Sequence, residues 1–430
     1  MAKSLKSFQS IRGMADLVPD QSDAWSSMEK KIFDIFSNYS FEEIRTPLVE
    51  NTNLFHRSIG EVSDIIEKEM YSFPDRNDES LSLRPEGTAG CVRAAIERGL
   101  LNIPRKLWYS GPMFRYEKPQ KGRHRQFHQI GGEVFGYSSV SADAELIILN
   151  NRFWTSLGLK DSIKLTMNNI GSSEDREKYN SILIEYLSDY KSSLNENDLQ
   201  RLKTNPLRVL DSKDKSIKSL LKNAPRIADY ISSESIDRQE NLEEILNANS
   251  IDFQVNPGLV RGLDYYNDTV FEWVSDNIGA QGTVCAGGRY DNLVEQLGGK
   301  SIPAVGFAIG LERLFLLLQS KEFSNLGIKK SPEIYMVVPE EKYHKYAFMI
   351  SEDIHNNFPN IRISHDFSNS GIKSHFKRAD KLGAKLAIII GDEEFIERSL
   401  SVKNLITGEQ SKFFIDKSCK EFIDYVGVTI

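Results

Sequence analysis

Apolar residues recur along this chain at two spacings, one typical of helices and one typical of strands. Segment 20–39 has the three- and four-residue spacing of a helix face that packs on a core, with Trp25, Met28, Ile32 and Ile35 on that face. Segments 106–109, 113–116 and 126–135 are rich in strand formers, and a glycine-containing basic loop separates the last two. This pattern predicts a helix followed later by an antiparallel hairpin with a long tip.

The composition and periodicity of the sequence change twice further along the chain. Residues 172–249 are polar and lysine-rich, have helical periodicity and contain few strand formers, which predicts a helical insertion. Strand and glycine content return from 251 to 318. After a polar linker at 319–332, short apolar runs at 334–338, 361–364, 386–390 and 401–405 alternate with helical segments. This alternation predicts a separate C-terminal α/β domain with a mainly parallel sheet.

Composition narrows the class of protein. The 430 residues are 40% hydrophobic and 27% charged, which is typical of globular domains and excludes wholesale disorder and fibrous folds. No apolar run approaches the length of a membrane span, and the N-terminus lacks the apolar core of a secretory signal. The three cysteines lie far apart, which excludes a disulfide framework and a zinc ribbon. We therefore expect a soluble cytoplasmic protein with no membrane contact.

Basic residues gather in three segments although the net charge is −7. These segments are 115–128, 201–226 and 373–385. Local basic patches on an acidic body suit a large polyanion that is touched at several points. Each patch alone is more typical of a solvated helix face or loop, so this alternative stays open.

The most informative segment for chemistry is 111–136. Alternate residues of a strand share one face, so Phe127, Gln129 and Glu133 would lie in a row across from Arg115. Such a face can clamp a phosphate, stack a planar ring and hold a cation. A half-buried hairpin with ordinary cross-strand pairs is the alternative. Burying these polar groups without a ligand is costly, which favours a binding site.

Other segments contribute weaker candidates. Glu86 and Thr88 lie at a strand-to-helix turn, where they could take an ammonium group, although Pro-Glu-Gly is also an ordinary helix start. Arg261 precedes Tyr265 and Tyr266, and tyrosines are more often core than ligand. A lone helical arginine such as Arg313 is usually solvated. The sequence has no metal-ligand spacing and no nucleophile beside a base, so we expect positioning and charge neutralisation, as in nucleotidyl transfer.

These segments together resemble a known enzyme family. The arginine-bearing strand and loop at 111–136 and GFAIGLERL at 306–314 resemble motifs 2 and 3 of class II aminoacyl-tRNA synthetases, and FEEIRTP at 41–47 resembles the dimer-forming motif 1. LVRGLDYY at 259–266 and AGGRYD at 286–291 are similar to the signature peptides of the histidyl-tRNA synthetase family. Lys118 and Asn292 depart from that family's common arginine and glycine.

The resemblance implies a fold and a set of domains. The fold would be an α+β catalytic domain with an antiparallel sheet, a helical insertion and a C-terminal α/β anticodon-binding domain. The catalytic core would be 1–171 with 250–322, the insertion 172–249 and the anticodon-binding domain 331–430. The implied activity is ATP-dependent activation of L-histidine and its transfer to the 3′ end of tRNA(His), by a homodimer using ATP with Mg²⁺.

The resemblance also implies roles for single residues. Arg115 would bind the ATP α-phosphate, Phe127 would stack on the adenine, and Arg123 with Arg313 would hold the γ-phosphate. Arg261 would neutralise the α-phosphate during attack. The remaining set would bind histidine: the ammonium group by Glu86, Thr88 and Gln129, and the imidazole by Glu133 and Tyr266, with Tyr265 beside them.

Two rival functions remain at this point. One is the synthetase-like, histidine-binding regulatory subunit of ATP phosphoribosyltransferase, which lacks the C-terminal domain and usually degrades the Arg261 peptide. Both features are intact here. The other rival is a different class II synthetase, for which LVRGLDYY would have to be coincidental.

Overall fold

The computed structural model describes residues 7–19, 21–60, 63–211, 214–221, 223–263, 265–279, 282–323, 326, 331–368, 370–415 and 420–429. The chain divides into two compact units, Met1–Gly327 and Ile328–Ile430. Residues 324, 325 and 327–330 of the expected linker lie outside the described residues, as do Asp264 and Cys419.

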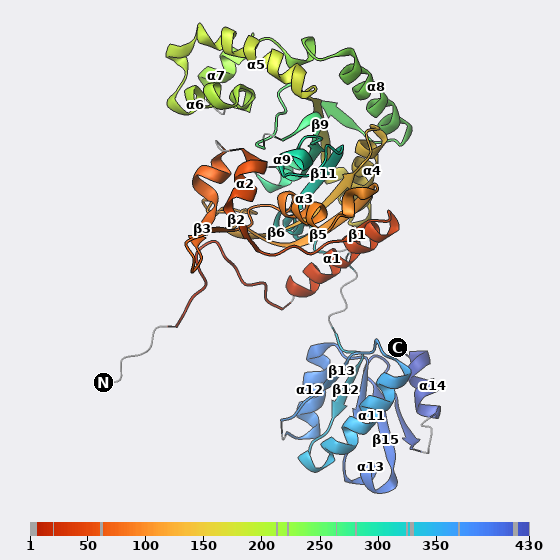
Figure 1. Cartoon of the computed structure of the whole chain (residues 1–430). Helices are drawn as coiled ribbons and strands as arrows, with labels where there is room; N and C mark the ends of the chain where they lie inside the picture. The colour runs from red at the N-terminus through yellow and green to blue at the C-terminus, as the bar shows by residue number, and fades with distance from the viewer. Residues whose placement is uncertain are drawn as a thin grey trace, which may run out of the picture. The chain divides into compact units, whose positions relative to one another are not determined.

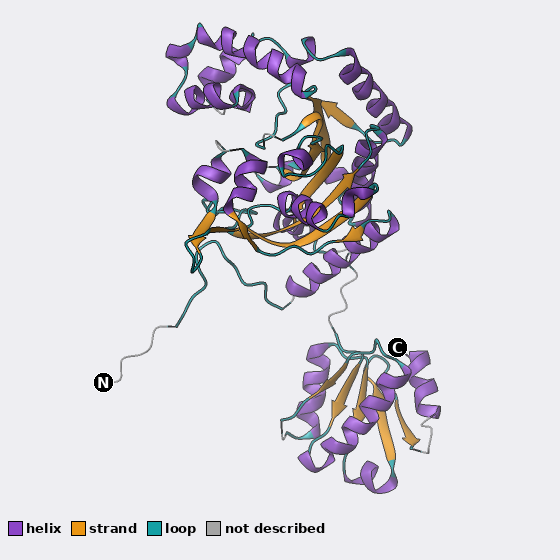
Figure 2. Ribbon diagram, in the orientation of Figure 1, coloured by secondary structure: helices purple, strands orange, loops and turns teal. Residues whose placement is uncertain are grey.

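An eight-stranded sheet forms the centre of the first unit (Figures 1 and 2). Its six inner strands pair antiparallel, and each edge adds one parallel strand. In sheet order the strands are β1 (Glu42–Glu43), β5 (Arg105–Phe114), β6 (Gln126–Phe135), β11 (Ala304–Gly310), β10 (Thr283–Arg289), β9 (Asn267–Val274), β7 (Lys164–Asn169) and β8 (Phe253–Val255).

The expected hairpin at 106–135 is present, with two differences. The expected segment 106–109 and the first two residues of 113–116 form one continuous strand, β5, because Gly111 and Pro112 keep the ladder register opposite Gln129 and His128. The expected strand at 41–47 is reduced to the two residues of β1, which pair with Leu107 and Trp108.

A smaller sheet and several helices complete the part of this unit outside residues 172–249. The small sheet has the order β2 (Val49–Asn51), β4 (Ser80–Leu83) and β3 (Tyr71–Pro74). The helices are α1 (Gln21–Asn38), α2 (Thr52–Ile59), α3 (Thr88–Glu97), α4 (Ser141–Ser156), α9 (Leu293–Gln296) and α10 (Leu311–Ser320), with a π-helical turn η1 (Ile65–Glu69) and 3₁₀ turns η2 (Leu100–Asn102), η3 (Lys160–Ser162) and η7 (Asp276–Ile278).

The described residues between β7 and β8 contain helices and no strand. The helices are α5 (Ser173–Ser188), α6 (Glu196–Thr204), α7 (Lys215–Leu221) and α8 (Ser233–Ala248), with 3₁₀ turns η4 (Lys191–Ser193), η5 (Pro206–Asp211) and η6 (Ile227–Asp229). A capping box at Ser172 and Asp175 starts α5. Leu183 and Leu187 belong to the same buried cluster as Tyr265, so the helical segment shares a hydrophobic core with the rest of the first unit.

A five-stranded sheet forms the second unit. The sheet order is β13 (Ile363–His365), β12 (Ile334–Val337), β14 (Leu386–Ile389), β15 (Ser399–Asn404) and β16 (Gln410–Phe414). Its helices are α11 (His344–Asn357), α12 (Ile372–Leu382), α13 (Asp392–Glu397) and α14 (Lys420–Thr429), with a 3₁₀ turn η8 (Glu341–Tyr343).

The expectation of a mainly parallel sheet in this unit is wrong for two strands. β12 runs parallel to β13 and β14, but β15 and β16 pair antiparallel. Residues 390–398 are too few for a parallel crossover, which needs about a dozen residues. Arg398 instead turns the chain back with φ 49°. Among the described residues, none of the helices combines the length and apolarity that crossing a bilayer would require.

Candidate active site

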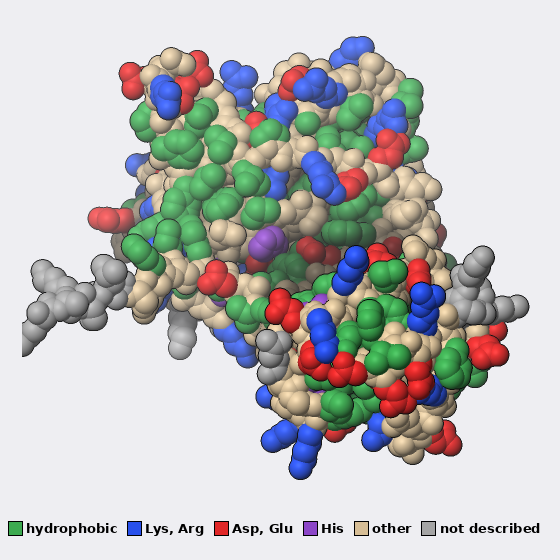
Figure 3. Space-filling view, turned by 90° about the horizontal axis from the view of Figure 1, so that it is seen from below, with side chains coloured by type: hydrophobic (Ala, Val, Ile, Leu, Met, Phe, Trp, Pro, Cys, Tyr) green, Lys and Arg blue, Asp and Glu red, His purple; other side chains and the backbone are tan. Residues whose placement is uncertain are grey.

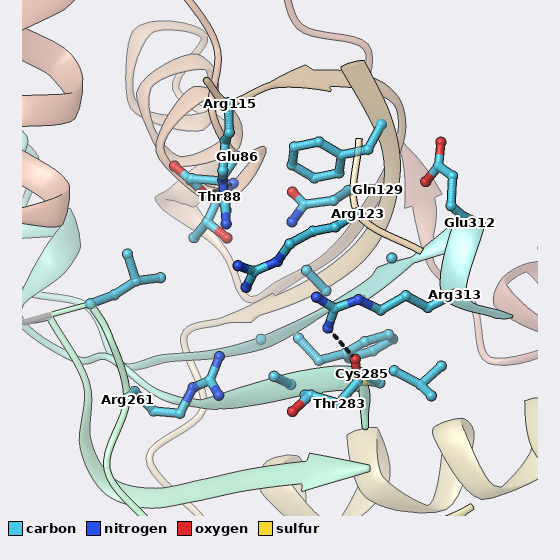
Figure 4. Close-up of a pocket in the computed structure, with 18 of the residues that line it drawn as sticks. Glu86, Thr88, Arg115, Arg123, Gln129, Arg261, Thr283, Cys285, Glu312 and Arg313 are labelled. Atoms are coloured by element: carbon cyan, nitrogen blue, oxygen red, sulfur yellow. Dashed lines mark hydrogen bonds between the residues drawn. The ribbon is translucent and has the colours of Figure 1, made fainter. Parts of the chain in front are cut away.

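One cavity on the large sheet gathers every residue predicted for the site (Figure 4). Its walls come from β6, β10, β11, the start of α3, the start of α10 and the 259–266 peptide. The predicted residues that line it are Glu86, Thr88, Arg115, Arg123, Phe127, Gln129, Glu133, Arg261, Tyr265, Tyr266 and Arg313. The face-sharing expected of Phe127, Gln129 and Glu133 is therefore present.

A fully buried carboxyl group forms one end of this cavity. Glu133 accepts a hydrogen bond of 2.7 Å from the Thr88 hydroxyl and one of 3.3 Å from the Tyr109 hydroxyl on Oε1. The Tyr290 hydroxyl donates to Oε2. Burial raises the pKa of Glu133 to about 8, so this carboxyl group is mainly protonated at neutral pH. A neutral carboxyl ringed by hydroxyls can both donate and accept toward a polar ligand.

Glycine in the neighbouring strand makes room for this carboxyl group. Gly306 pairs with Glu133 across β11 and β6. A Cβ added at Gly306 would lie 1.6 Å from Glu133 Oε2 and 3.0 Å from the Gly132 carbonyl oxygen. The position therefore requires glycine because a side chain would collide with the buried carboxyl.

Glu86 has a structural task that the sequence left open. Its Oε2 accepts the Thr88 N–H at 2.6 Å and its Oε1 accepts the Ala89 N–H at 2.9 Å. Glu86 thus caps the start of α3, as the alternative interpretation of Pro-Glu-Gly expected. Burial raises the pKa of this carboxyl group. Each oxygen keeps a lone pair, so capping leaves Glu86 able to accept from a bound ammonium group.

Three guanidinium groups occupy the opposite part of the cavity. Arg115 lies 5.3 Å from the Phe127 ring centroid and donates to the Pro85 carbonyl at 2.8 Å. Arg313 donates to the Thr283 carbonyl, and Figure 4 shows it extending beside Arg123 into the cavity. The alternative that Arg313 is simply solvated is therefore wrong. Burial, together with the charge of Arg123, lowers the pKa of Arg313. This part of the cavity is arranged for an anion.

Arg261 enters the cavity from the other side (Figure 4). It pairs with Glu272 on β9, and its guanidinium lies 5.8 Å from the Tyr266 ring centroid. Burial lowers the pKa of Arg261, but the Glu272 carboxylate together with Tyr266 and Tyr265 outweighs burial, so the net pKa is raised. Within the described part of the chain, Arg261 Nε and Gln129 Oε1 are buried without a hydrogen-bond partner. Buried polar atoms without a partner are uncommon, and both of these belong to residues that line the cavity.

Several residues of the cavity were missed at the sequence level. Tyr290 lies within AGGRYD, but its contact with Glu133 depends on strand register that the sequence does not reveal. Glu117 lies 2.7 Å from Arg123, and Thr283 donates to Glu272 at 3.0 Å. Outside the cavity, Asn292, noted only as a departure from the family pattern, donates to Ser173 Oγ at 2.7 Å. No sequence signal identified these four contacts.

The basic segments have more than one use. Within 115–128, Arg115 and Arg123 line the cavity while Arg125 stacks 3.8 Å over the Tyr116 ring. Arg208 of the second segment donates to the Gly262 carbonyl. On the face shown in Figure 3, lysine and arginine side chains are scattered among acidic and neutral ones.

Comparison with known proteins gives a consistent result. A family model described as "Histidyl-tRNA synthetase" matches residues 13–314, and one described as "Anticodon binding domain" matches residues 331–426. A curated "Histidine--tRNA ligase" from Marinomonas sp. (strain MWYL1) is 50% identical over 412 residues, which cover 96% of this chain and 97% of that protein.

Solved structures agree with the sequence matches. Apo histidyl-tRNA synthetase of S. aureus is 36% identical with a TM-score of 0.82, covering 97% of this chain and 100% of that one. Histidyl-tRNA synthetase of Nostoc sp. PCC 7120 is 20% identical with a TM-score of 0.69, covering 99% and 100%, and shows a common fold. These matches confirm the expected α+β catalytic domain and C-terminal anticodon-binding domain. Since the first family model spans well over half of the chain and a relative is half identical along nearly its whole length, the chain belongs to the histidyl-tRNA synthetase family.

Proposed function

We propose that this protein activates L-histidine with ATP, forming histidyl-adenylate, and transfers histidine to the 3′ end of tRNA(His). One observation carries the proposal. A single cavity has a buried carboxyl group surrounded by hydroxyl groups in one part, and guanidinium groups line its other part. The first part suits a small polar side chain, and the second suits phosphates. Membership of the family supports the same assignment.

Histidine would bind in the part around Glu133. The carboxyl of Glu133 and the phenol of Tyr266 would meet the two ring nitrogens, with Tyr265 beside them. Gln129 Oε1, which has no partner among the described residues, would accept from the ammonium group together with Glu86 and Thr88. A side chain without ring nitrogens would leave these buried groups unpaired, which is the basis for rejecting other amino acids.

ATP would bind in the arginine-lined part. Phe127 already stacks on Arg115 with one face and would offer the other to adenine. Arg115 would bind the α-phosphate, and Arg123 with Arg313 the γ-phosphate. The histidine carboxylate oxygen would attack the α-phosphorus, forming a P–O bond while the bond to pyrophosphate breaks. Arg261 would stabilise the charge that develops on the α-phosphate oxygens.

Magnesium would enter with ATP rather than at a site built from protein side chains alone. Among the described residues, no three His, Cys, Asp or Glu side chains are grouped as a metal site. Glu117 pairs with Arg123, and Glu86 is assigned to the ammonium group, so neither cavity carboxylate is assigned to a metal ion. Phosphate oxygens, which Mg²⁺ prefers, would supply most of its ligands.

Family membership supports the remaining assignments. The catalytic core would comprise 1–171 and 250–322, with 172–249 as its insertion, and 331–430 would bind the anticodon of tRNA(His). The match of 331–426 to an anticodon-binding model supports this role and disfavours the regulatory alternative, whose proteins lack such a domain. A cytoplasmic homodimer is the expected state.

ATP–pyrophosphate exchange with each of the twenty amino acids tests this proposal directly. We expect exchange with histidine alone, and only when ATP and Mg²⁺ are both present. Equal exchange with a second amino acid would make the pocket assignment wrong. Histidine binding without any exchange would favour the alternative function, a histidine-binding regulatory subunit.

A further inference from the structure

A bulge interrupts β9 directly after the two cavity tyrosines. Gly288 of β10 pairs with Val270, but the next residue, Arg289, pairs with Asn267, so residues 268 and 269 have no partners in β10. Asp268 lies in this bulge with φ 47°, a left-handed conformation that is uncommon outside glycine. Bulges re-aim neighbouring side chains, and this bulge begins two residues after Tyr266.

The helical segment between β7 and β8 holds this bulge through a buried hydrogen bond. Ser235 on α8 donates its hydroxyl to Asp268 Oδ1 at 2.8 Å, and the two residues are 2% and 8% exposed. The backbone of Asp268 bonds to the chain entering α5: its N–H donates to the Gly171 carbonyl at 2.8 Å, and its carbonyl accepts the Ile170 N–H at 2.9 Å. The chain entering α5 and the start of α8 therefore meet at the bulge.

Two further contacts link the same helices to the cavity peptides. Asn292, which follows the Tyr290 peptide, donates to Ser173 Oγ at the start of α5. Arg208 in η5 donates to the carbonyl of Gly262, the neighbour of Arg261. Each peptide that carries a cavity tyrosine is thus bonded to the segment 172–249.

We propose that Ser235 and Asp268 are positioning residues for histidine binding. Their hydrogen bond fixes the bulge, and the bulge fixes the direction in which Tyr265 and Tyr266 face Glu133. The orientation of the helical segment then sets the affinity of the histidine pocket, and a ligand that shifts these helices changes histidine affinity without touching the pocket. This inference rests on the proposed function and adds a control element to it.

Two substitutions at Asp268 distinguish the effect of its backbone conformation from the effect of its side chain. Asp268→Gly keeps the left-handed backbone but removes the acceptor, whereas Asp268→Asn tolerates this conformation and keeps a bond to Ser235. In the asparagine variant the amide can donate to Ser235 Oγ, whose hydroxyl can turn to Asp175 Oδ2, 3.4 Å away. Ser235→Ala removes the other partner of the same bond.

The experiment is histidine-dependent ATP–pyrophosphate exchange on full-length variants whose folding is checked by circular dichroism. We expect Ser235→Ala and Asp268→Gly each to raise the histidine KM at least about fivefold, with kcat and the ATP KM within about twofold, because only the ground-state pocket is disturbed. Asp268→Asn should restore the histidine KM to within about twofold of wild type. The double variant should be no worse than Asp268→Gly, which already lacks the bond to Ser235 and also loses the 2.9 Å bond that Asn267 Nδ2 donates to Asp268 Oδ2.

Ser58→Ala is the matched control. Ser58 is also 2% exposed, but its hydroxyl bonds within its own helix, to the Leu54 carbonyl. It should lose stability without a change in histidine KM. Folded Ser235→Ala and Asp268→Gly with wild-type histidine KM, or an equal rise in Ser58→Ala, would overturn the inference. Wild-type protein without histidine-dependent exchange would instead overturn the proposed function.

Discussion

Arg261 combines a structural contact with an unused donor. Its Nη1 pairs with Glu272 on β9, and Glu272 in turn accepts a hydrogen bond from Thr283. The Arg261 side chain is therefore held in place by the sheet. Its Nε is buried without a partner in the described structure. A guanidinium that is held from one side and unsatisfied on the other is pre-organised for a phosphate oxygen. Pre-organised donors act mainly on the transition state.

Arg261→Ala should therefore lower kcat for pyrophosphate exchange by at least about 10²-fold, the scale observed on losing one such donor. The histidine KM should change much less, because ground-state binding is not what was removed. Arg261→Lys should rescue only part of the loss, since an ammonium group lacks the planar pair of N–H donors with which a guanidinium binds two phosphate oxygens.

The matched control is Arg93→Ala, which breaks pairs with Glu50 and Glu97 but does not line the cavity. If Arg261 merely braced its peptide, kcat and KM would worsen together. A folded Arg261→Ala enzyme with near-normal kcat would contradict the catalytic role.

At the scale of elements, the cavity is a meeting point of strands and a helix end. Glu133 on β6 receives hydroxyls from α3, from β5 and from the turn after β10. Gly306 on β11 leaves the space that the carboxyl fills. No element alone makes this environment, so the protonation state of Glu133 reports whether all of them are assembled.

This protonation gives a pH dependence with a definite sign. The pKa of Glu133 is about 8 in the folded protein and about 4.3 in an unfolded chain. The folded state binds the additional proton between these values, so this contribution to stability is complete below pH 4.3 and is lost as pH rises through 8. Glu133→Gln should flatten the fall of Tm between pH 5 and pH 8, measured by thermal denaturation.

Glu97→Gln is the control for this pH experiment. Glu97 is a half-exposed partner of Arg93 outside the cavity. Its replacement should leave the slope of Tm against pH unchanged. Identical slopes for wild type and Glu133→Gln would show that Glu133 is ionised in the folded protein.

At the scale of the whole molecule, the chain separates two tasks. The cavity lies entirely within the first unit, and the second unit has its own sheet and its own core cluster around Ile334, Leu386 and Leu400. An independent core means that the second unit can be removed without opening the sheet of the first.

Removal of 331–430 should leave histidine-dependent exchange largely intact while reducing kcat/KM for charging tRNA(His) by at least about tenfold, since anticodon contacts would be lost. Aminoacylation of tRNA(His) and exchange would be measured on the same preparation. Unchanged kcat/KM for charging would make the anticodon-binding assignment wrong.

Sequence patterns predicted what depends on local periodicity. The shared face of Phe127, Gln129 and Glu133 follows from the two-residue period of a strand, and the pattern located the helices between 172 and 249. Features that depend on register were missed: the Tyr290 contact with Glu133 and the bulge at Asp268 both arise from pairing between distant strands. The antiparallel β15 was missed because a run of alternating elements does not show how short a connection is.

The position of the helical segment between β7 and β8 also affects the order in which parts of the first unit fold. Lys164 pairs with Val274, so β7 and β9 come together only after a closure spanning more than a hundred residues. Local helices form much faster than such distant pairings, and they shorten the effective span that must close. A nascent chain would carry β5 and β6 long before β9, β10 and β11 are synthesised, leaving the β6 edge unpaired meanwhile. The cavity around Glu133 would then be among the last parts of the first unit to form, and chaperone dependence during synthesis would concentrate on that open edge.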